Sequence, residues 1–155
     1  MLKTSAMSLF DSVDNGYAKA IINICDCHGN ISCQNNLQFR VRYPGSYAAD
    51  QIARKYNLHE MGTISHNVEN GILIINAYVC ENFNDQMSIM NGTLFDPTIF
   101  LACMYQVKDV LSDHGLNDVL VSISSFSKFG FELPNLFELM NYVARSLPYN
   151  LVVTV

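Results

Sequence analysis

A nearly continuous apolar run, AKAIINICDC from Ala18 to Cys27, constrains the fold of this chain more than any other feature. Strands buried on both faces of a sheet have such runs, whereas half-exposed strands alternate apolar and polar residues. Two shorter runs, Val119 to Ser124 and Leu151 to Val155, follow in the C-terminal half. The sequence therefore predicts a sheet with several central strands, covered on both faces.

Helices are predicted between these strands. Asp96 followed by Pro97 is a strong helix start, because aspartate is a good N-cap and proline suits the first helical position. Apolar residues then recur at three- and four-residue spacing, and Gly115 fits the C-terminal cap. Further helical patterns lie at Asn35 to Arg42, Ser46 to Tyr56 and Pro134 to Val143.

A hairpin is predicted in the middle of the chain. Met61 to Asn67 and Ile72 to Cys80 are rich in strand-forming residues, and Asn70-Gly71 between them is a turn signal. Strands alternate with helices along the whole sequence, and no linker interrupts it. We therefore predict a single domain, residues 1–155, with a three-layer α/β/α fold around a mixed sheet of about six strands.

Composition restricts the function. The 155 residues carry a net charge of -5, and their nine lysines and arginines include only a small group at Arg40, Arg42, Arg54 and Lys55. This disfavours duplex nucleic acid as a partner, although backbone N–H groups at a helix start can still hold an anionic small ligand. No run approaches the ~18 apolar residues of a membrane span, and the N-terminus is a poor secretory signal. We expect a soluble, cytoplasmic protein with free thiols.

Three segments carry a resemblance to a known family. The first, IINICDCHGNISCQNNLQFRVRYPGSYAAD, has Cys25, Cys27, Pro44, Tyr47 and Asp50 at matching spacing. The second, MGTISHNVENGILIINAYV, supplies Gly62, Thr63, Asn76, Ala77 and Tyr78. The third runs from the Asp96 helix to the last strand. In this order the segments resemble a macro domain of the divergent phage or bacterial type, related to ADP-ribose-binding and ADP-ribose 1″-phosphate phosphatase-like proteins.

The departures from the family pattern fall at the ligand site. The family's adenine-binding aspartate corresponds to Ser8, and the asparagine that touches the distal ribose is Asp26. Ser32 and Gln34 replace glycines of the first loop, and only Gly130 remains in the second, although glycines allow close backbone approach to a ligand. Losing several contacts of ~1 kcal/mol each would remove most of a micromolar affinity. We therefore expect ordinary ADP-ribose binding to be weak or absent.

The resemblance implies a binding site formed by the two loops that flank the central strands. Its predicted residues are Ser8, Asp26, His28, Ser32, Cys33, Gln34, Asn35, Ser125, Ser127, Lys128, Phe129 and Gly130. The preferred hypothesis is a degenerate macro-like domain, possibly phage-encoded, that binds a nucleotide derivative related to ADP-ribose or a host protein, with no catalysis and no cofactor. One alternative is an active hydrolase with a site rebuilt from Asp26, His28 and Ser32. Another is a homo-oligomeric interaction module without a ligand.

Single residues allow sharper hypotheses about chemistry. Asp26 and His28 could form an acid–base pair, but a solvated polar strand end is the preferred interpretation. Cys33 precedes a helix, which favours a nucleophile, but no base is identifiable. Lys128 could hold a phosphate, although a solvated loop lysine is preferred. Four residues could bind zinc, but their spacing is not a standard one, so no metal is predicted; they are Cys25, Cys27, His28 and Cys33.

Two segments have two interpretations each. The phenylalanines at 126, 129 and 131 either pack inward or form an outward patch for a protein partner. The polar, methionine-rich segment from Glu81 to Leu94 is predicted to be a mobile loop over the cleft or at an edge.

Overall fold

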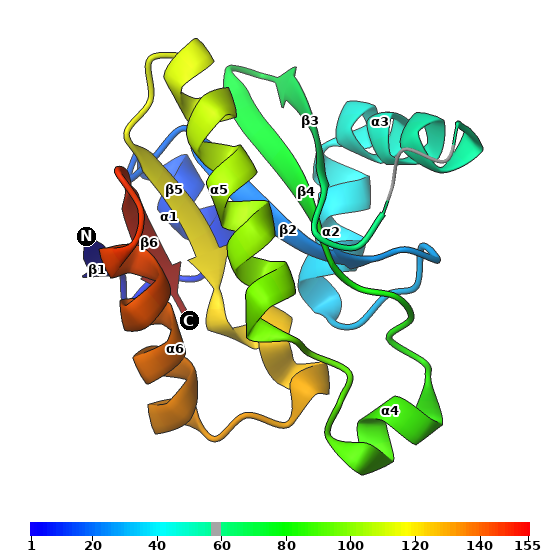
Figure 1. The fold of residues 1–155 in the computed structure, drawn as a ribbon. Helices are drawn as coiled ribbons and strands as arrows, with labels where there is room; N and C mark the ends of the chain where they lie inside the picture. Colours follow the sequence, from blue (N-terminus) through cyan, green and yellow to red (C-terminus); the bar gives the residue numbers. More distant parts are fainter. Residues whose placement is uncertain (57–59) are drawn as a thin grey trace.

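Six strands form one mixed sheet in the computed structural model, which describes residues 1–56 and 60–155 (Figure 1). The strand order is β1-β6-β5-β2-β4-β3, and all neighbours are parallel except β3 and β4. The strands are β1 (Leu2–Thr4), β2 (Ala20–Asp26), β3 (Ile64–Glu69), β4 (Ile72–Cys80), β5 (Asp118–Ser122) and β6 (Asn150–Thr154). The predicted mixed sheet is confirmed.

Helices cover both faces of the sheet (Figure 1). The helical segments are α1 (Leu9–Asp14), α2 (Gln34–Arg42), α3 (Pro44–Lys55), α4 (Gln86–Asn91), α5 (Pro97–Asp113), the 3-10 helix η1 (Ile123–Phe129) and α6 (Leu133–Arg145). Buried residues of α5 and α6 form the core on one face, and those of α1 and α2 form the core on the other. The three-layer α/β/α prediction is therefore confirmed.

The central position of β2 follows from its apolar run. Ile22 and Ile24 lie in the core of α5 and α6, whereas Ile21, which precedes them, lies in the core of α1 and α2. All three isoleucines are fully buried, and β2 is hydrogen-bonded to β4 on one side and β5 on the other. The prediction of a strand buried on both faces is confirmed.

Local turn and cap signals also act as predicted. Asn70 and Gly71 have φ values of 53° and 76°, the left-handed conformation that a tight hairpin turn requires, and β3 and β4 pair through it. The Asp96 carboxylate accepts the Thr98 N–H at 2.9 Å as the N-cap of α5, and Gly115 follows its last turn with φ 65°.

Two predicted elements differ from the structure. The strand predicted over Val119 to Ser124 ends at Ser122, because the Ser122 hydroxyl accepts the Ser124 N–H at 3.2 Å and η1 begins at Ile123. The segment from Glu81 to Leu94 is not a plain loop, since it contains α4, whose first turn is capped by the Asp85 side chain.

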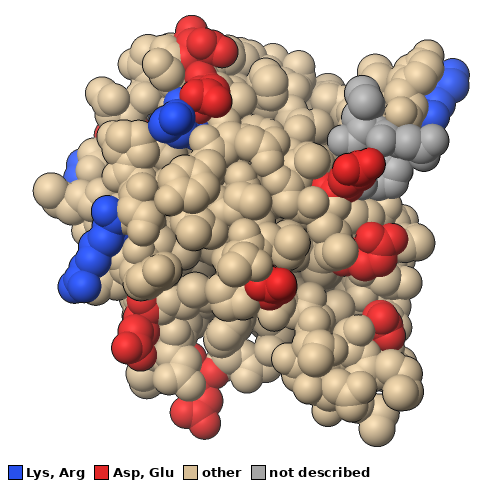
Figure 2. Space-filling model, viewed as in Figure 1, with Lys and Arg blue, Asp and Glu red and all other residues tan. Residues whose placement is uncertain are grey.

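The surface over α5 and α6 carries few charges. Figure 2 shows lysine and arginine side chains separated from one another on this face, with larger uncharged areas between them. Among the described residues, no helix is both long enough and apolar enough to cross a membrane.

Candidate functional site

A small polar cavity lies where the carboxyl ends of β2 and β4 meet α2 and α3. Its volume of about 20 Å³ suits a single water molecule. In α/β sheets this edge is the usual ligand-binding region, because strand ends meet helix starts there. The cavity is lined by Asn23, Cys25, Gly29, Asn30, Asn36, Phe39, Arg40, Ser46, Tyr47, Asp50, Arg54 and Asn76.

Three asparagines form a hydrogen-bonded chain along one wall. The amide of Asn36 donates to the Asn23 side-chain oxygen at 2.7 Å, and Asn23 donates to the Asn76 side-chain oxygen at 3.1 Å. Asn76 in turn donates to the Ser65 hydroxyl at 3.1 Å. Asn36 and Asn76 are buried, so their paired amides fix the orientation of every group in the chain.

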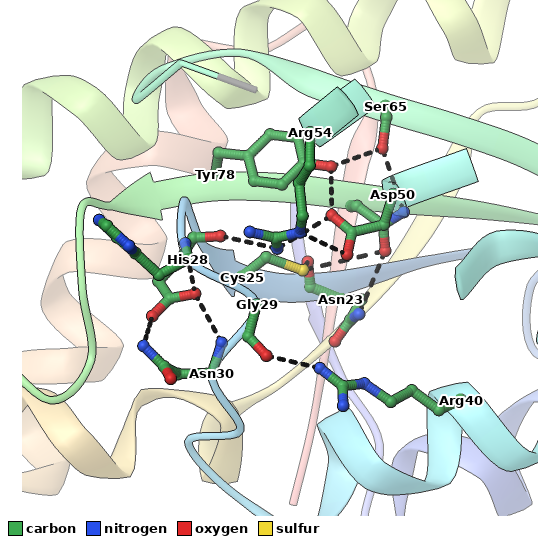
Figure 3. A network of polar contacts seen from close by, with 12 residues as sticks. Asn23, Cys25, His28, Gly29, Asn30, Arg40, Asp50, Arg54, Ser65 and Tyr78 are labelled. Carbon is green, nitrogen blue, oxygen red and sulfur yellow. Dashed lines mark hydrogen bonds and ion pairs between the residues drawn. The ribbon is translucent and has the colours of Figure 1, made fainter. Parts of the chain in front are cut away.

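An ion pair stabilises another part of the cavity lining (Figure 3). Arg54 donates to both oxygens of Asp50, at 3.0 and 3.1 Å, and the Tyr78 hydroxyl donates to Asp50 at 2.6 Å. Burial, followed by the hydrogen bond to Asp50, raises the pKa of Tyr78 well above its usual value. Tyr78 therefore remains a neutral donor, and Asp50 joins α3 to β4.

Arg40 lines the cavity beside Gly29 (Figure 3) and the exposed Tyr47, and we call this more exposed side of the cavity its mouth. Its Nη2 donates to the Gly29 carbonyl at 2.6 Å, and its guanidinium lies 4.7 Å from the centre of the Tyr47 ring. Within residues 1–56 and 60–155 it makes no ion pair with a carboxylate, unlike Arg54. Its charge therefore remains available to an anionic ligand.

Gly29 is required by the geometry of this mouth. Its φ is +76°, and a Cβ at this position would lie 3.2 Å from Cζ of Arg54. Any larger residue would therefore be strained and would also push against Arg54. The site residues predicted from the sequence included neither Gly29 nor Arg40. The small basic group in α2 and α3 was the sequence signal that could have pointed to Arg40.

Asp26 is buried rather than solvated. Its side chain is 0% exposed, and its carboxylate accepts four hydrogen bonds of 2.9 to 3.1 Å. The donors are the backbone N–H groups of His28, Asn30 and Phe83 and the side-chain amide of Asn30. The preferred interpretation as a solvated strand end is therefore wrong, because the carboxylate organises the loop that follows β2.

The structure does not bring the three proposed hydrolase side chains together. The imidazole of His28 is hydrogen-bonded to Glu81 at 3.1 Å, and only its backbone N–H reaches Asp26. The Ser32 hydroxyl donates to the Asn36 side chain at 2.8 Å. Asp26 and His28 thus form no acid–base pair, and each of the three side chains has a separate partner.

The two predicted ligand loops touch each other directly. The Asn35 amide donates to the hydroxyls of Ser124 and Ser125, at 2.9 and 3.3 Å. Ser125 is buried, and Gly130 ends η1 with φ 72°. Side-chain contacts therefore bridge the crevice that the resemblance places between these loops.

The other predicted residues lie in different settings. Ser8 is the N-cap of α1 and accepts the Asp11 N–H at 3.3 Å. Cys33 precedes α2 and is partly exposed, with its thiol 3.9 Å from the Asn36 side-chain oxygen. Three further residues are exposed and do not line the polar cavity; they are Gln34, Ser127 and Lys128.

The phenylalanines of η1 pack inward. Phe126 is buried, and Phe129 lies 4.7 Å from Phe95 and 6.0 Å from Phe83 between ring centres. Phe131 also contacts Phe95, at 5.2 Å. The outward aromatic patch is therefore not formed.

The cysteines differ in their expected reactivity. Burial is the main cause that raises the pKa of the Cys27 and Cys103 thiols to about 12, and it also raises the pKa of Cys25 and Cys80. Among the described residues, no three His, Cys, Asp or Glu side chains converge as a metal site requires.

We predict that Cys33 alone reacts rapidly with a thiol reagent in the folded protein, because it is the only partly exposed cysteine and thiolate is the reactive form. Titration with Ellman's reagent at pH 8 is expected to release about one equivalent quickly. The Cys33→Ser variant should give no fast phase, and a fast phase that persists in this variant would contradict the prediction.

Comparison with known proteins gives the fold its name. No protein-family model matches the sequence, and no curated protein matches it. Solved structures do match. The macrodomain of Mycobacterium tuberculosis DarG superposes with a TM-score of 0.76 at 18% identity, over 99% of this chain and 97% of that one. The chain has the macrodomain fold.

Two further solved structures that match the chain were determined with a nucleotide. Thermosipho africanus DarTG in complex with ADP-ribose has a TM-score of 0.74 at 12% identity, over 99% of this chain and 41% of that one. The Oceanobacillus iheyensis macrodomain with ADP has a TM-score of 0.62 at 12% identity, over 89% of this chain and 75% of that one. The resemblance inferred from the three sequence segments is thus confirmed for the fold.

Proposed function

We propose that this macrodomain-like chain binds a nucleotide derivative related to ADP-ribose and acts by binding rather than by catalysis. The ligand lies across the carboxyl ends of the central strands, with its terminal group at the mouth of the polar cavity. The observation that carries the proposal is the Arg40 guanidinium, which lies at this mouth without a carboxylate partner in the described chain. The ADP-ribose and ADP complexes of two structural neighbours support the ligand class.

The site favours an anionic terminal group over a neutral one. Arg40 is held in place by Tyr47 and by the Gly29 carbonyl, so little side-chain entropy is lost when it binds an anion. A phosphate oxygen is a stronger acceptor for a guanidinium than a neutral carbonyl. Because the cavity suits only one water, the terminal group stays at the mouth and accepts from guanidinium N–H groups that the bond to Gly29 leaves free.

The state of the reactive groups supports binding rather than catalysis. A general base must have a free acceptor within reach of its substrate. The Asp26 carboxylate is buried and already accepts four hydrogen bonds, and His28 and Ser32 are bonded to other residues. No contact therefore supports the alternative of a hydrolase built from these three residues.

A binding titration tests the proposal. We expect ADP-ribose 1″-phosphate to bind about tenfold or more tightly than ADP-ribose, since a charge-assisted hydrogen bond contributes about 1.5–3 kcal/mol. The Arg40→Ala variant should lose this difference, and Arg145→Ala, which removes an exposed arginine at the end of α6, should keep it. Isothermal titration calorimetry measures all three proteins. If the wild type binds neither nucleotide, or if Arg40→Ala keeps the wild-type preference for ADP-ribose 1″-phosphate, the proposal is contradicted.

The remaining hypotheses stay predictions. A protein partner is compatible with α4, whose Met87 and Met90 are 67% and 80% exposed, but the aromatic patch predicted for such a partner is absent. Homo-oligomerisation and a phage origin likewise stay predictions.

A further inference from the structure

The segment between β4 and α5, residues 81–95, touches both loops of the crevice, and we call it the brace. Its middle part, α4, projects from the rest of the molecule (Figure 1) and has no buried residue. The brace is therefore held at its two ends.

The first end is anchored by polar contacts to the loop that follows β2. Glu81 is hydrogen-bonded to the His28 imidazole at 3.1 Å, and the Asn30 amide donates to the Asn82 side-chain oxygen at 2.8 Å. The Phe83 N–H donates to the buried Asp26 carboxylate at 2.9 Å. Three consecutive residues of the brace thus hold one loop of the crevice.

Aromatic contacts anchor the brace to η1, which forms the other loop. Phe95 lies 4.7 Å from Phe129 and 5.9 Å from Phe126 between ring centres. Phe83 also reaches this cluster, with its ring centre 6.0 Å from that of Phe129. Such aromatic pairs each contribute about 0.5–1.5 kcal/mol beyond the area that they bury.

Phe83 connects the two anchors within one residue. Its backbone N–H bonds to Asp26, which organises the first loop, and its fully buried ring packs on Phe129 of the second. We propose that Phe83 is a positioning residue that sets the separation of the two crevice loops, so that ligand affinity depends on a ring outside the ligand site. No residue of the brace lines the polar cavity, so this effect is indirect.

Hydrogen exchange of the free protein tests whether Phe83 positions both loops. The Phe83→Leu variant keeps the backbone bond to Asp26 but removes the ring from Phe129. We expect amide exchange to become about fivefold faster in peptides covering residues 27–33 and 123–130. The matched control is Phe137→Leu, which alters a partly buried phenylalanine of α6 in the same core.

The exchange result is decisive in either direction. Each variant is measured at the same number of degrees below its own melting temperature. Exchange that is faster in both loops of Phe83→Leu, but not in those of Phe137→Leu, supports the proposal. If exchange in Phe83→Leu changes in only one loop, or becomes faster uniformly over the whole chain, the proposal is overturned.

Ligand affinity tests the second half of the proposal, which rests on the proposed function. With ADP-ribose 1″-phosphate as the probe, Phe83→Leu is expected to bind about tenfold more weakly than the wild type, and Phe137→Leu to bind normally. Unchanged affinity in Phe83→Leu would overturn the link between the brace and the ligand. If the wild type binds no probe, the proposed function fails, and the exchange experiment alone decides whether Phe83 positions the loops.

Discussion

Replacing Asp26 by alanine is expected to lower the free energy of unfolding by about 4 kcal/mol, a large loss for a domain of ordinary stability. The variant would leave three backbone N–H groups and the Asn30 amide without their acceptor. Each unsatisfied buried donor costs about 1–3 kcal/mol, and partial access of water to the loosened loop reduces the sum. Urea denaturation followed by far-UV circular dichroism measures the change, because the chain has no tryptophan.

A matched aspartate serves as the control for this result. Asp14 forms an exposed ion pair with Arg42 at 2.6 Å, and its side chain is 54% exposed. Asp14→Ala is expected to cost less than about 1 kcal/mol, as is usual for surface ion pairs. Equal losses in the two variants would show that the Asp26 carboxylate does not hold the loop as described.

Removing Asp50, which pairs with Arg54 within α3 and accepts from Tyr78 of β4, is the second large effect. Asp50→Ala is expected to cost about 3–5 kcal/mol, because it leaves the Arg54 guanidinium and the Tyr78 hydroxyl without their shared acceptor. The side chains of Arg54 and Asp50 are only 17% and 9% exposed, so water replaces the lost partner poorly. Thermal and urea unfolding provide the measurement.

A double variant separates the charge effect from the loss of packing. Asp50→Ala with Arg54→Met removes both charges and keeps an apolar side chain of similar length. We expect it to recover at least about 1 kcal/mol relative to Asp50→Ala alone, since an uncompensated buried charge is the main penalty. If the second substitution adds its own full cost instead, the charge of Arg54 is not what destabilises the single variant.

The sequence alone was sufficient for most of the fold, because the relevant signals are local. The apolar run of β2 could be buried only on both faces, and Asn70-Gly71 has the backbone freedom of a tight turn. The Asp96 side chain accepts a backbone N–H of the first turn of α5, and Pro97 has no N–H that needs an acceptor. Such features depend on a few neighbouring residues, so they can be read before any tertiary contact is known.

The candidate site was only partly predictable, and Asp26 shows why. Strict alternation along a strand would place Asp26 and His28 on one face, but the pairing of β2 with β4 shifts register between Cys25 and Asp26. A bulge of this kind re-aims the side chains that follow it. The carboxylate consequently points at backbone donors of its own loop and of Phe83, which is 57 residues away in the sequence.

Tertiary structure also decided which arginine pairs with a carboxylate. Arg54 and Arg40 belong to one basic group in the sequence, yet Arg54 pairs with Asp50 whereas Arg40 crosses to the Gly29 carbonyl. The sequence determined the layers of the fold. The separation of the two loops depends on contacts of Asn35 with η1 and of Phe83 with Phe129, made between segments distant in the chain, which no periodicity encodes.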